Sequence, residues 1–461
     1  MHSHDPSIAR LADEAVGYAL ERVRMDPVPL DAPRPYDDLL REVGQTITPD
    51  GIGGSEALRL FTEVLAPACI SVDHPRFLAF VPGAPTEASV LFDMVVSASS
   101  IYAGSWLEAA GAVFAENQAL RWLADLAEFP ESAGGAFVSG GTAGNLSALI
   151  AARHRWRARS HARFDKVRGI VLASKGAHSS IAQATHAMDV DLVHVPTDER
   201  GRLHGTAVRQ TFDSLPLADR ERVFAIAATG GTTNVGVIDD LAGIADLCRE
   251  HNIWFHVDGA YGLAALCAPS VRANFTGIER ADSFIVDPHK WLFGPFDCCA
   301  LVYRNIHDGR RAHTQNAEYL EVLRGGEGEE GPWHEMNPAD VAHHLSRRAR
   351  GLPLWFSLAT HGTSAYTTAM ETTLDVARAA AREIERRPHL ELLFEPDLTV
   401  LVFRRRGWAP EDYRRWSDDQ LYSGESFVVP SSWNGETVLR FCIVNPRTTI
   451  DDVVAILDSL D

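Results

Sequence analysis

Two ionisable residues stand directly after apolar runs, where burial would change their chemistry. Lys290 follows the run at 283–286, and a lysine that is removed from water can become a neutral amine nucleophile. Asp258 ends the run at 253–257, where a carboxylate is costly unless a cation or hydrogen bonds compensate for its burial. An aspartate in this position could equally cap the N-terminus of a helix. The pair suggests a lysine that reacts as a nucleophile, with an acidic group nearby.

A glycine-rich segment, Gly140–Asn145 (GGTAGN), follows the apolar run at 136–139 and opens a helical pattern. Small residues let backbone N–H groups approach an anion at the positive end of a helix, and Thr142 adds a hydroxyl. The segment could therefore bind a phosphate, or it could be a tight turn between a strand and a helix. It lacks the glycine spacing of dinucleotide-binding and P-loop proteins. His178, after the run at 170–173, could likewise be a catalyst or a helix-start residue.

The elements that must position these residues are short β-rich runs alternating with helical patterns. Such alternation is typical of an α/β fold with a mostly parallel sheet covered by helices. Ligands of these sheets bind beyond the carboxyl ends of the strands, which is where the four segments lie. The expected strands are 136–139, 170–173, 192–195, 223–228, 253–257, 283–286 and 300–303.

The sequence patterns at the two ends of the chain predict an N-terminal helical segment and a small C-terminal domain. An amphipathic helix over 6–24 leads into a proline-rich arm, and such a helix needs a surface to lie on. Strand-like runs at 399–404 and 437–444, with a closing helix at 451–460, predict a small α+β domain. The glycine-rich acidic segment 325–331 has no packing residues and predicts a mobile loop.

Composition excludes several classes of partner. The 461 residues carry 43 Lys and Arg against 62 Asp and Glu, a net charge of −19, which repels nucleic acid and anionic membrane surfaces. The six cysteines lack the spacing of a metal site and fit a reduced compartment. The N-terminus does not read as a signal peptide, and no apolar run is long enough to span a membrane. We therefore expect a cytoplasmic protein.

Together, the anion-binding segment, His178, Asp258 and Lys290 form the set that pyridoxal 5′-phosphate requires. This cofactor needs a phosphate site, a flat group against its ring, a carboxylate that keeps the pyridine nitrogen protonated, and a lysine for a Schiff base. The order and company of the four signals predict a pyridoxal-phosphate enzyme more strongly than any one of them does.

The chain resembles the pyridoxal-phosphate-dependent group II amino-acid decarboxylases, particularly their aromatic-L-amino-acid branch, over nearly its whole length. The resemblance implies the type I, aspartate-aminotransferase-like α/β fold. It divides the chain into an N-terminal helical dimerisation segment (1–86), a large cofactor-binding domain (87–362) and a small C-terminal α+β domain (363–461). It also implies a homodimer with active sites at the subunit interface. The segments that carry it are HPRFLAFVP, SGGTAGNLSAL, KGAHSS, HVDGAY, ADSFIVDPHKW, LSRRARGLPLWF and LRFCIVNPRTT.

The resemblance also implies roles for single positions. Lys290 would form the Schiff base, Asp258 would pair with the pyridinium nitrogen, and His178 would stack on the ring. The remaining cofactor contacts would be Gly141, Thr142, Thr233, Ala260, Asp287 and His289. The substrate pocket would comprise His74, Phe80, Val81, Gly104 and His289. The implied reaction converts an L-amino acid, preferably an aromatic one, to its amine and carbon dioxide.

One departure from the family pattern puts the product in question. Aromatic decarboxylases carry a loop tyrosine linked to protonation of Cα, but no tyrosine lies between Tyr319 and Arg347, and Pro338 stands near the expected position. Without that tyrosine, the alternative outcome is decarboxylation with oxidative deamination to an aldehyde. Otherwise His334 or His178 would have to supply the proton.

Two more departures concern the pocket itself. Gly104 stands where the animal enzymes carry a bulky aromatic residue, which would enlarge or reshape the substrate pocket. Asp287 replaces an asparagine near the phosphate. A carboxylate beside a phosphate is unfavourable unless it turns away or is hydrogen-bonded.

Two other functional classes fit the sequence less well. A metal-dependent hydrolase could use His256, Asp258 and His289, but no helical pair of metal ligands accompanies them, and this reading leaves Lys290 unexplained. A non-catalytic binding or structural dimer would be expected to lose at least one of the residues Lys290, Asp258 and His178. All three are present.

Overall fold

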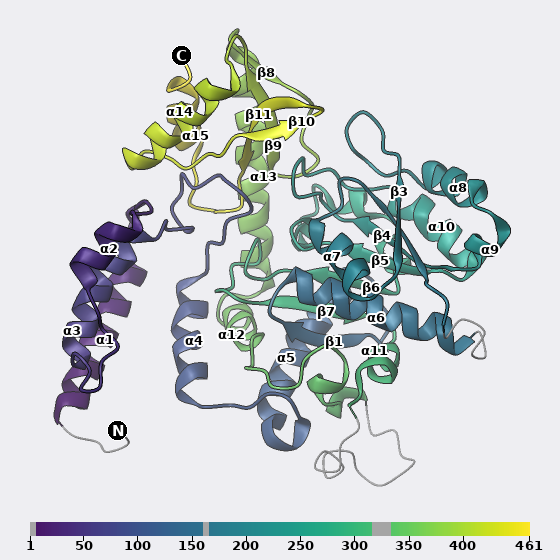
Figure 1. Ribbon diagram of the computed structural model, residues 1–461, viewed down its shortest axis with the longest axis horizontal. Coiled ribbons are helices and arrows are strands. Elements are labelled where there is room, and N and C mark those ends of the chain that lie inside the picture. The colour runs from purple at the N-terminus through teal and green to yellow at the C-terminus, as the bar shows by residue number, and fades with distance from the viewer. Residues whose placement is uncertain (1–5, 160–165, 316–332) are drawn as a thin grey trace.

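The computed structural model describes residues 6–159, 166–315 and 333–461, and its centre is a seven-stranded sheet between layers of helices (Figure 1). The strand order is β1-β7-β6-β5-β4-β2-β3. Strands β2 to β6 pair in parallel, whereas β7 runs antiparallel to both of its neighbours. The mostly parallel α/β sheet predicted from the sequence is thereby confirmed. Its strands are β1 (Gly134–Val138), β2 (Ile170–Ser174), β3 (Asp191–Val195), β4 (Val223–Thr229), β5 (Trp254–Asp258), β6 (Ser283–Val286) and β7 (Cys299–Tyr303).

The inner strands are buried along their whole length, because helices cover both faces of the sheet. Every residue of β2, β4, β5 and β6 is buried, which explains why their sequences are continuous apolar runs rather than alternating ones. Helices α6 (Gly141–Arg159), α7 (Ser179–Ala187) and α11 (Ile306–His313) pack on one face. The other face is covered by α5 (Trp106–Leu126), α8 (Gly205–Ser214) and α10 (Leu241–His251).

The C-terminal part forms a second, antiparallel sheet of order β10-β11-β9-β8. Its inner strands correspond to the two runs predicted from the sequence, while the two three-residue edge strands were not predicted. The strands are β8 (Leu390–Leu392), β9 (Val400–Arg405), β10 (Ser431–Trp433) and β11 (Glu436–Cys442). Helices α13 (Thr363–Arg386), α14 (Pro410–Tyr422) and α15 (Ile450–Asp458) pack against them. The small α+β unit expected here is therefore present.

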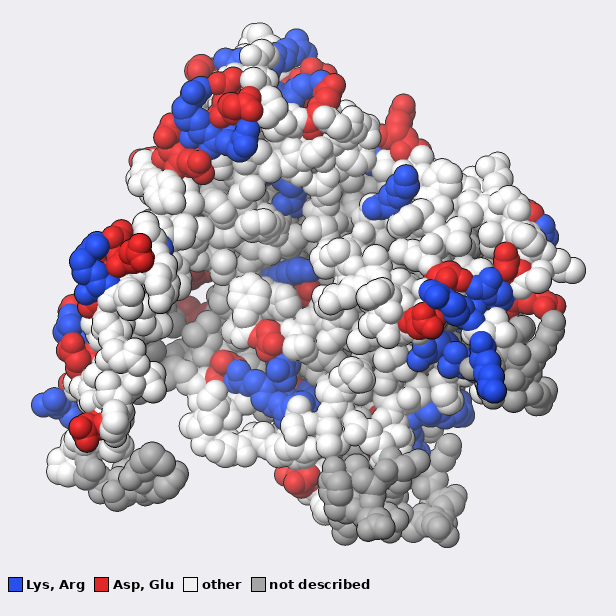
Figure 2. All heavy atoms as spheres, viewed as in Figure 1, with Lys and Arg blue, Asp and Glu red and all other residues white. Residues whose placement is uncertain are grey.

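The N-terminal helices lie to one side of the molecule, set apart from the two sheets (Figure 1). They are α1 (Pro6–Arg24), α2 (Tyr36–Val43) and α3 (Gly54–Leu60). No residue of α1 or α2 is buried, although both helices are amphipathic. Figure 2 shows acidic and basic side chains interspersed over these helices and over the small domain.

Helices α4 (Glu87–Ala98) and α12 (Leu352–His361) pack against each other. Helix α4 turns Leu91, Met94 and Val95 outward, so the residues that the structure describes leave part of its apolar surface exposed. Of the helices that the structure describes, none combines the length and apolarity needed to cross a lipid bilayer.

Candidate active site

A cavity of about 240 Å³ lies at the carboxyl ends of β4, β5 and β6. This is the edge at which open α/β sheets bind their ligands. Thr229 ends β4, Asp258 ends β5, and Asp287 follows β6, so that three neighbouring strands deliver side chains to one space. The nine residues that the sequence predicted as cofactor contacts all line it: Gly141, Thr142, His178, Thr233, Asp258, Ala260, Asp287, His289 and Lys290.

Lys290 lies in the turn after β6 and forms an ion pair inside the cavity. Its Nζ is 2.7 Å from Oδ2 of Asp287, a carboxylate that is only 2% exposed. Burial lowers the pKa of Lys290, but the charge and hydrogen bond of Asp287 outweigh that effect, and the net pKa is raised above the ordinary value. In this structure the lysine is therefore held as an ammonium ion by a buried partner.

Asp258 is buried at the end of β5 and accepts hydrogen bonds from neutral donors. Its Oδ2 accepts from Asn145 Nδ2 at 2.9 Å, and its Oδ1 accepts from the backbone N–H of Ala260 at 3.1 Å. The interpretation as a helix cap is wrong, because the next helical turn begins at Gly262 and has no side-chain cap. Within the described ranges Asp258 forms no ion pair, so its negative charge faces the cavity without a directly bonded cation.

His178 serves as the N-cap of α7 and also forms a wall of the cavity. Its Nδ1 accepts the backbone N–H of Ser180 at 3.2 Å and lies 2.8 Å from the Ser180 hydroxyl. The two interpretations of this histidine are therefore compatible: capping fixes the ring, and the fixed ring borders the cavity.

Asn145 links these groups and was not singled out from the sequence. Its Nδ2 donates to Ser180 Oγ at 2.8 Å as well as to Asp258, and its Oδ1 lies 2.8 Å from Nε2 of His256. A hydrogen-bonded chain thus runs from His178 through Ser180 and Asn145 to Asp258. The sequence feature that could have identified Asn145 is a polar residue on the apolar face of a helix that begins at a glycine-rich turn.

His256 is a structural residue in this arrangement and not a metal ligand. Its Nδ1 lies 2.8 Å from Ser283 Oγ, so both ring nitrogens have partners. Burial lowers the pKa of His256 to about 4, which keeps the imidazole neutral. Among the residues that the structure describes, no three His, Cys, Asp or Glu side chains are grouped so that they could hold a metal ion. The geometry therefore gives no support to the metal-dependent hydrolase.

The glycine-rich segment forms a tight turn between β1 and α6, and part of it lines the cavity. A Cβ on Gly144 would lie 2.7 Å from Ile285, so this glycine lets α6 pack closely on the sheet. A Cβ on Gly141 would lie 3.4 Å from Oδ2 of Asp287 and would narrow the cavity. Because Gly141 and Thr142 begin α6 and line the cavity, the positive end of the helix is available to an anion there.

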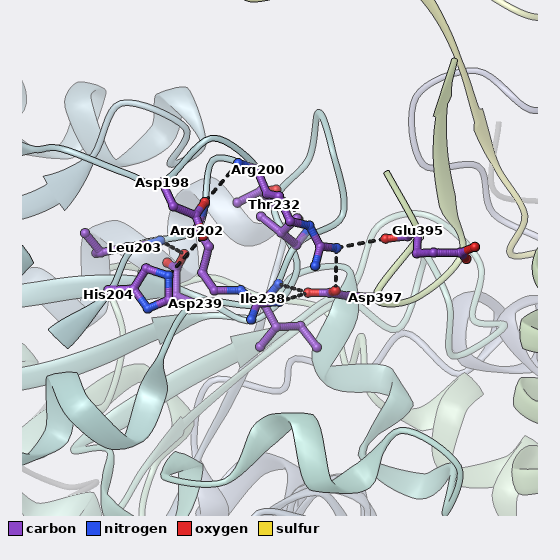
Figure 3. Close-up of polar contacts among 11 residues, drawn as sticks. Asp198, Arg200, Arg202, Leu203, His204, Thr232, Ile238, Asp239, Glu395 and Asp397 are labelled. Carbon is purple, nitrogen blue, oxygen red and sulfur yellow. Dashed lines mark hydrogen bonds and ion pairs between the residues drawn. The ribbon is translucent and has the colours of Figure 1, made fainter. Parts of the chain in front are cut away.

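A buried carboxylate, Asp239, is hydrogen-bonded to the backbone at the end of β4 (Figure 3). Asp239 accepts the backbone N–H of Thr229 at 2.7 Å and that of Leu203 at 2.8 Å. Burial raises the pKa of Asp239 to about 7. Asp239 therefore fixes the strand end from which the loop to Thr233 leaves, without touching the cavity itself.

A second anchor ties the same region to the small domain (Figure 3). Asp397 accepts from Arg200 Nη2 at 2.8 Å, from the backbone N–H of Ile238 at 3.1 Å, and from Arg202. Asp397 precedes β9, whereas its partners lie in the segments that follow β3 and β4. The ion pairs therefore join the segment before β9 to the large sheet.

A larger cavity of about 650 Å³ adjoins the first one and shares His178 and Thr233 with it. Phe80 and Trp433 provide aromatic surface on its wall. Arg440 borders it, with Nη1 donating to the carbonyl of Phe80 at 2.6 Å and Nη2 donating to that of Thr233 at 2.9 Å. The space beside His178 is thus partly aromatic, with one guanidinium at its edge.

The predicted substrate residues are not all gathered there. Phe80 lines the larger cavity and His289 the smaller one, whereas His74, Val81 and Gly104 line neither. His74 accepts the backbone N–H of Arg76, and Val81 packs against the core of the large sheet.

Gly104 has an aromatic side chain directly beside it. A Cβ there would lie 2.5 Å from the hydroxyl oxygen of Tyr102, so an aromatic side chain already fills the adjacent space. The expectation that Gly104 enlarges or reshapes the substrate pocket stays a prediction.

The region of the missing tyrosine is only partly described. The expected mobile loop 325–331 and Tyr319 lie outside the described residues. Pro338 is buried in a short 3-10 helix, and its carbonyl accepts from His344 Nε2 at 2.9 Å. His334 is exposed and lines neither cavity. Pro338 is therefore a packed residue without a group that can carry a proton.

The comparisons with known proteins identify the class to which this fold and cavity belong. The family model described as the pyridoxal-dependent decarboxylase conserved domain matches residues 56–406. The chain belongs to this family, whose members are pyridoxal-phosphate-dependent amino-acid decarboxylases.

Relatives cover nearly the whole chain. An aromatic-L-amino-acid decarboxylase from Bacillus atrophaeus is 29% identical and covers 91% of this chain and 88% of its own. An L-2,4-diaminobutyrate decarboxylase from Rhizobium meliloti is 30% identical over 84% of this chain and 78% of its own. The crystal structure of Oryza sativa TDC with PLP and tryptamine has a TM-score of 0.89 at 23% identity, covering 99% of both chains. The last likeness confirms the type I fold.

The residues of the cavity fit pyridoxal 5′-phosphate, the cofactor of the family. Lys290 offers an amine, Asp258 a buried carboxylate without an ion pair in the described part of the chain, and α6 a positive helix end. Asp287 is the exception, because its Oδ1 is buried and accepts no hydrogen bond from any described residue. An asparagine at this position could instead donate to an anion.

Proposed function

We propose that this enzyme decarboxylates an aromatic L-amino acid and releases the corresponding amine and carbon dioxide. The observation that carries the proposal is the wall of the larger cavity, where Phe80 and Trp433 stand with Val429 and Pro430 beside His178. Flat apolar surfaces of this kind suit an aromatic ring. The similarity to an aromatic-L-amino-acid decarboxylase supports it, although relatives acting on histidine and diaminobutyrate match as well.

In this proposal the cofactor supplies an electron sink for the bond that breaks at Cα. Lys290 would hold the cofactor through its Nζ amine, which lines the cavity. Asp258 holds a proton at the ring nitrogen, and its bonds to Asn145 and Ala260 keep the carboxylate oriented. A neutral ring nitrogen would make the sink much weaker.

The remaining cavity residues bind and orient. His178 and Ala260 would contact the ring of the cofactor, and the start of α6, with Gly141 and Thr142, would bind its phosphate together with Thr233; all five residues line the cavity. His289 borders the substrate.

His178 is also our candidate for the group that delivers a proton to Cα. It lines both cavities, whereas His334 lines neither of them. Nδ1 is already engaged with Ser180, so the proton would be held at Nε2.

We also propose that the enzyme is a homodimer with its active sites at the subunit interface. Residues 1–86 would form the dimerisation segment, 87–362 the cofactor-binding domain and 363–461 the small domain. The support is apolar surface without cover in one chain: Val95 on α4 is 51% exposed and Phe114 on α5 is 58% exposed. In the dimer, His74, Val81 and Gly104 would border the site from across the interface.

The test is to incubate the cofactor-loaded enzyme with each standard L-amino acid and to follow carbon dioxide release and oxygen consumption together. We expect the fastest release from an aromatic amino acid, without oxygen uptake. Fastest release from histidine or another polar substrate would overturn the aromatic assignment.

Oxygen consumption in step with carbon dioxide release would identify the second candidate, an aldehyde-forming enzyme. The observation that favours this candidate is the buried Pro338 near the position of the family tyrosine, which can deliver no proton to Cα.

A further inference from the structure

The ion pair between Lys290 and Asp287 places a proton acceptor directly on the amine that must react. Lys290 Nζ and Asp287 Oδ2 are 2.7 Å apart, and they belong to one turn after β6. An ammonium ion cannot add to an aldehyde, so a proton has to leave Nζ before Lys290 can bind the cofactor. Most of the Asp287 side chain is out of contact with water, and so is its free oxygen, Oδ1.

We propose that Asp287 accepts the proton of Lys290 each time this lysine becomes a nucleophile, an inference that rests on the proposed role of Lys290. The transfer converts an ammonium and a carboxylate into an amine and a carboxylic acid. The pair has no net charge before or after it, and no proton is exchanged with solvent. When the lysine is released from the cofactor, the same proton returns from Oδ2 to Nζ.

Burial makes this transfer more accessible than it is in water. Water stabilises separated charges strongly, whereas a site in which the carboxylate is only 2% exposed stabilises them less and reduces the energy gap to the neutral pair. The charged pair is still the resting form here, because Asp287 raises the pKa of Lys290 in spite of burial. Asp287 thus holds the amine inactive at rest and gives it a route to its neutral form.

The groups around the pair leave Asp287 as the acceptor. His289 Nε2 lies 3.6 Å from Asp287 Oδ2, but its Nδ1 accepts the backbone N–H of Cys298, which assigns the ring proton to Nε2. Burial lowers the pKa of His289 and so keeps the ring neutral. Burial, and then the charge of Asp287, raise the pKa of the Cys299 thiol.

Asp258 is the other acid that faces the lysine. It acts on Lys290 through its charge, after the charge and hydrogen bond of Asp287. No hydrogen bond joins Asp258 to Lys290 in the described part of the chain, and its oxygens accept from Asn145 and Ala260 instead. The proton of Nζ therefore has its direct acceptor in Asp287 Oδ2.

The experiment measures how fast the apo protein attaches pyridoxal 5′-phosphate, from the visible absorbance, at saturating cofactor between about pH 6 and 9. In the wild type we expect a nearly constant first-order rate, because transfer within the pair releases no proton. In Asp287→Asn the lysine loses the partner that raises its pKa and its proton must go to solvent, so the rate should rise about tenfold per pH unit up to the lowered pKa of the lysine and level off above it. Asp287→Glu, which retains a carboxylate, should restore most of the flat profile.

Asp282→Asn is the matched control. It removes the same charge at the other end of β6, where Asp282 pairs with Arg155 2.7 Å away, and it should keep the flat profile. Pyridoxal without a phosphate should give the same contrast between the wild type and Asp287→Asn, which excludes an effect of Asp287 on the phosphate alone.

Two results would overturn the proposal: a wild-type rate that rises tenfold per pH unit, or an Asp287→Asn rate as flat and as fast as that of the wild type. Failure of the proposed role of Lys290 is distinguishable from either, because Lys290→Ala would then still develop the visible absorbance.

Discussion

Lys290 is one of three lysines in the sequence, and the other two, Lys166 and Lys175, are exposed. Its position is set by a buried strand that ends at Val286 and by a turn in which Asp287 pairs with it. The amine lines the cavity, so a molecule bound in the cavity lies within its reach.

The first prediction concerns this amine. Lys290→Ala should abolish the visible absorbance of the cofactor-bound protein and lower turnover by at least about a thousandfold, because no other described lysine lines the smaller cavity. Lys166→Ala, a change at an exposed position, should alter neither quantity. Absorbance titration with the cofactor and carbon dioxide release measure the two effects, and normal turnover of Lys290→Ala would exclude the assignment.

A second prediction concerns Asn145, which makes three side-chain hydrogen bonds in the interior. Asn145→Ala removes the hydrogen bonds to Asp258 Oδ2 and His256 Nε2. Each buried polar group that loses its partner lowers the free energy of unfolding by about 1–3 kcal/mol. We expect a lower free energy of unfolding and weaker cofactor binding, measured by denaturant titration and by absorbance. Asn117→Ala removes only a bond to the His334 carbonyl at the surface and should change neither. An unchanged cofactor affinity in Asn145→Ala would contradict the positioning role.

At this scale the sequence revealed residues that end strands but not residues that support them. Lys290, Asp258 and His178 follow apolar runs, and their chemistry is unusual enough to notice in that place. Asn145 lies inside a helical pattern, where an asparagine normally faces solvent. Its burial follows from how closely α6 approaches the sheet at Gly144, and that distance is a tertiary property.

At the scale of elements, the strand end that leads to Thr233 depends on Asp239. This carboxylate has a pKa of about 7 in the folded protein, far above the ordinary value of an aspartate. The folded state therefore binds a proton more tightly than the unfolded state does. The stability that this proton provides is present at low pH and is lost as the pH rises towards 7.

The third prediction concerns how the free energy of unfolding changes with pH. Asp239 should lower the free energy of unfolding by up to about 1.4 kcal/mol per pH unit between about pH 4 and 7. Asp239→Asn should remove this contribution, although it also replaces one acceptor oxygen by an NH2 group. Asp213→Asn, at an exposed position, should keep the wild-type slope. Denaturant titrations across this range measure the difference, and equal slopes in wild type and Asp239→Asn would contradict the assignment.

Buried strands were predicted correctly from the sequence, whereas the short edge strands were not. The inner strands β2, β4, β5 and β6 of the large sheet are buried on both faces, so their sequences are mostly apolar and are recognisable without a partner. Strands β8 and β10 have three residues each, too few for periodicity to show, and they exist because β9 and β11 offer edges to pair with. The antiparallel direction of β7 has no signature in its composition.

At the scale of the whole molecule, the amphipathic helices α1 and α2 and the outward face of α4 carry apolar side chains that the described residues leave exposed. An amphipathic helix with no buried residue, such as α1, gains little from folding on its own. The sequence predicted that this helix needs a surface, but it could not predict which one, because a second copy leaves no separate signal in a single sequence.

The fourth prediction follows from these surfaces. Sedimentation should give about twice the chain mass of 50.5 kDa. Val95→Glu places a charge on the outward face of α4 and should shift the mass towards that of one chain, with a loss of activity. Leu217→Glu, at a position on α9 (Leu217–Arg220) that is 75% exposed, should leave the dimer intact. A wild-type protein that sediments as a single chain would contradict the proposed assembly.

The central claim is that the cavity beside Lys290 serves the decarboxylation of an aromatic L-amino acid. The most direct measurement is a competition in which the cofactor-loaded enzyme receives equal concentrations of L-tryptophan, L-tyrosine, L-phenylalanine, L-histidine and L-2,4-diaminobutyrate, and each amine is quantified. The wall formed by Phe80 and Trp433 predicts that one aromatic substrate has a kcat/KM at least about tenfold above those of histidine and diaminobutyrate, a difference of about 1.4 kcal/mol. A preference for histidine or diaminobutyrate would contradict the claim.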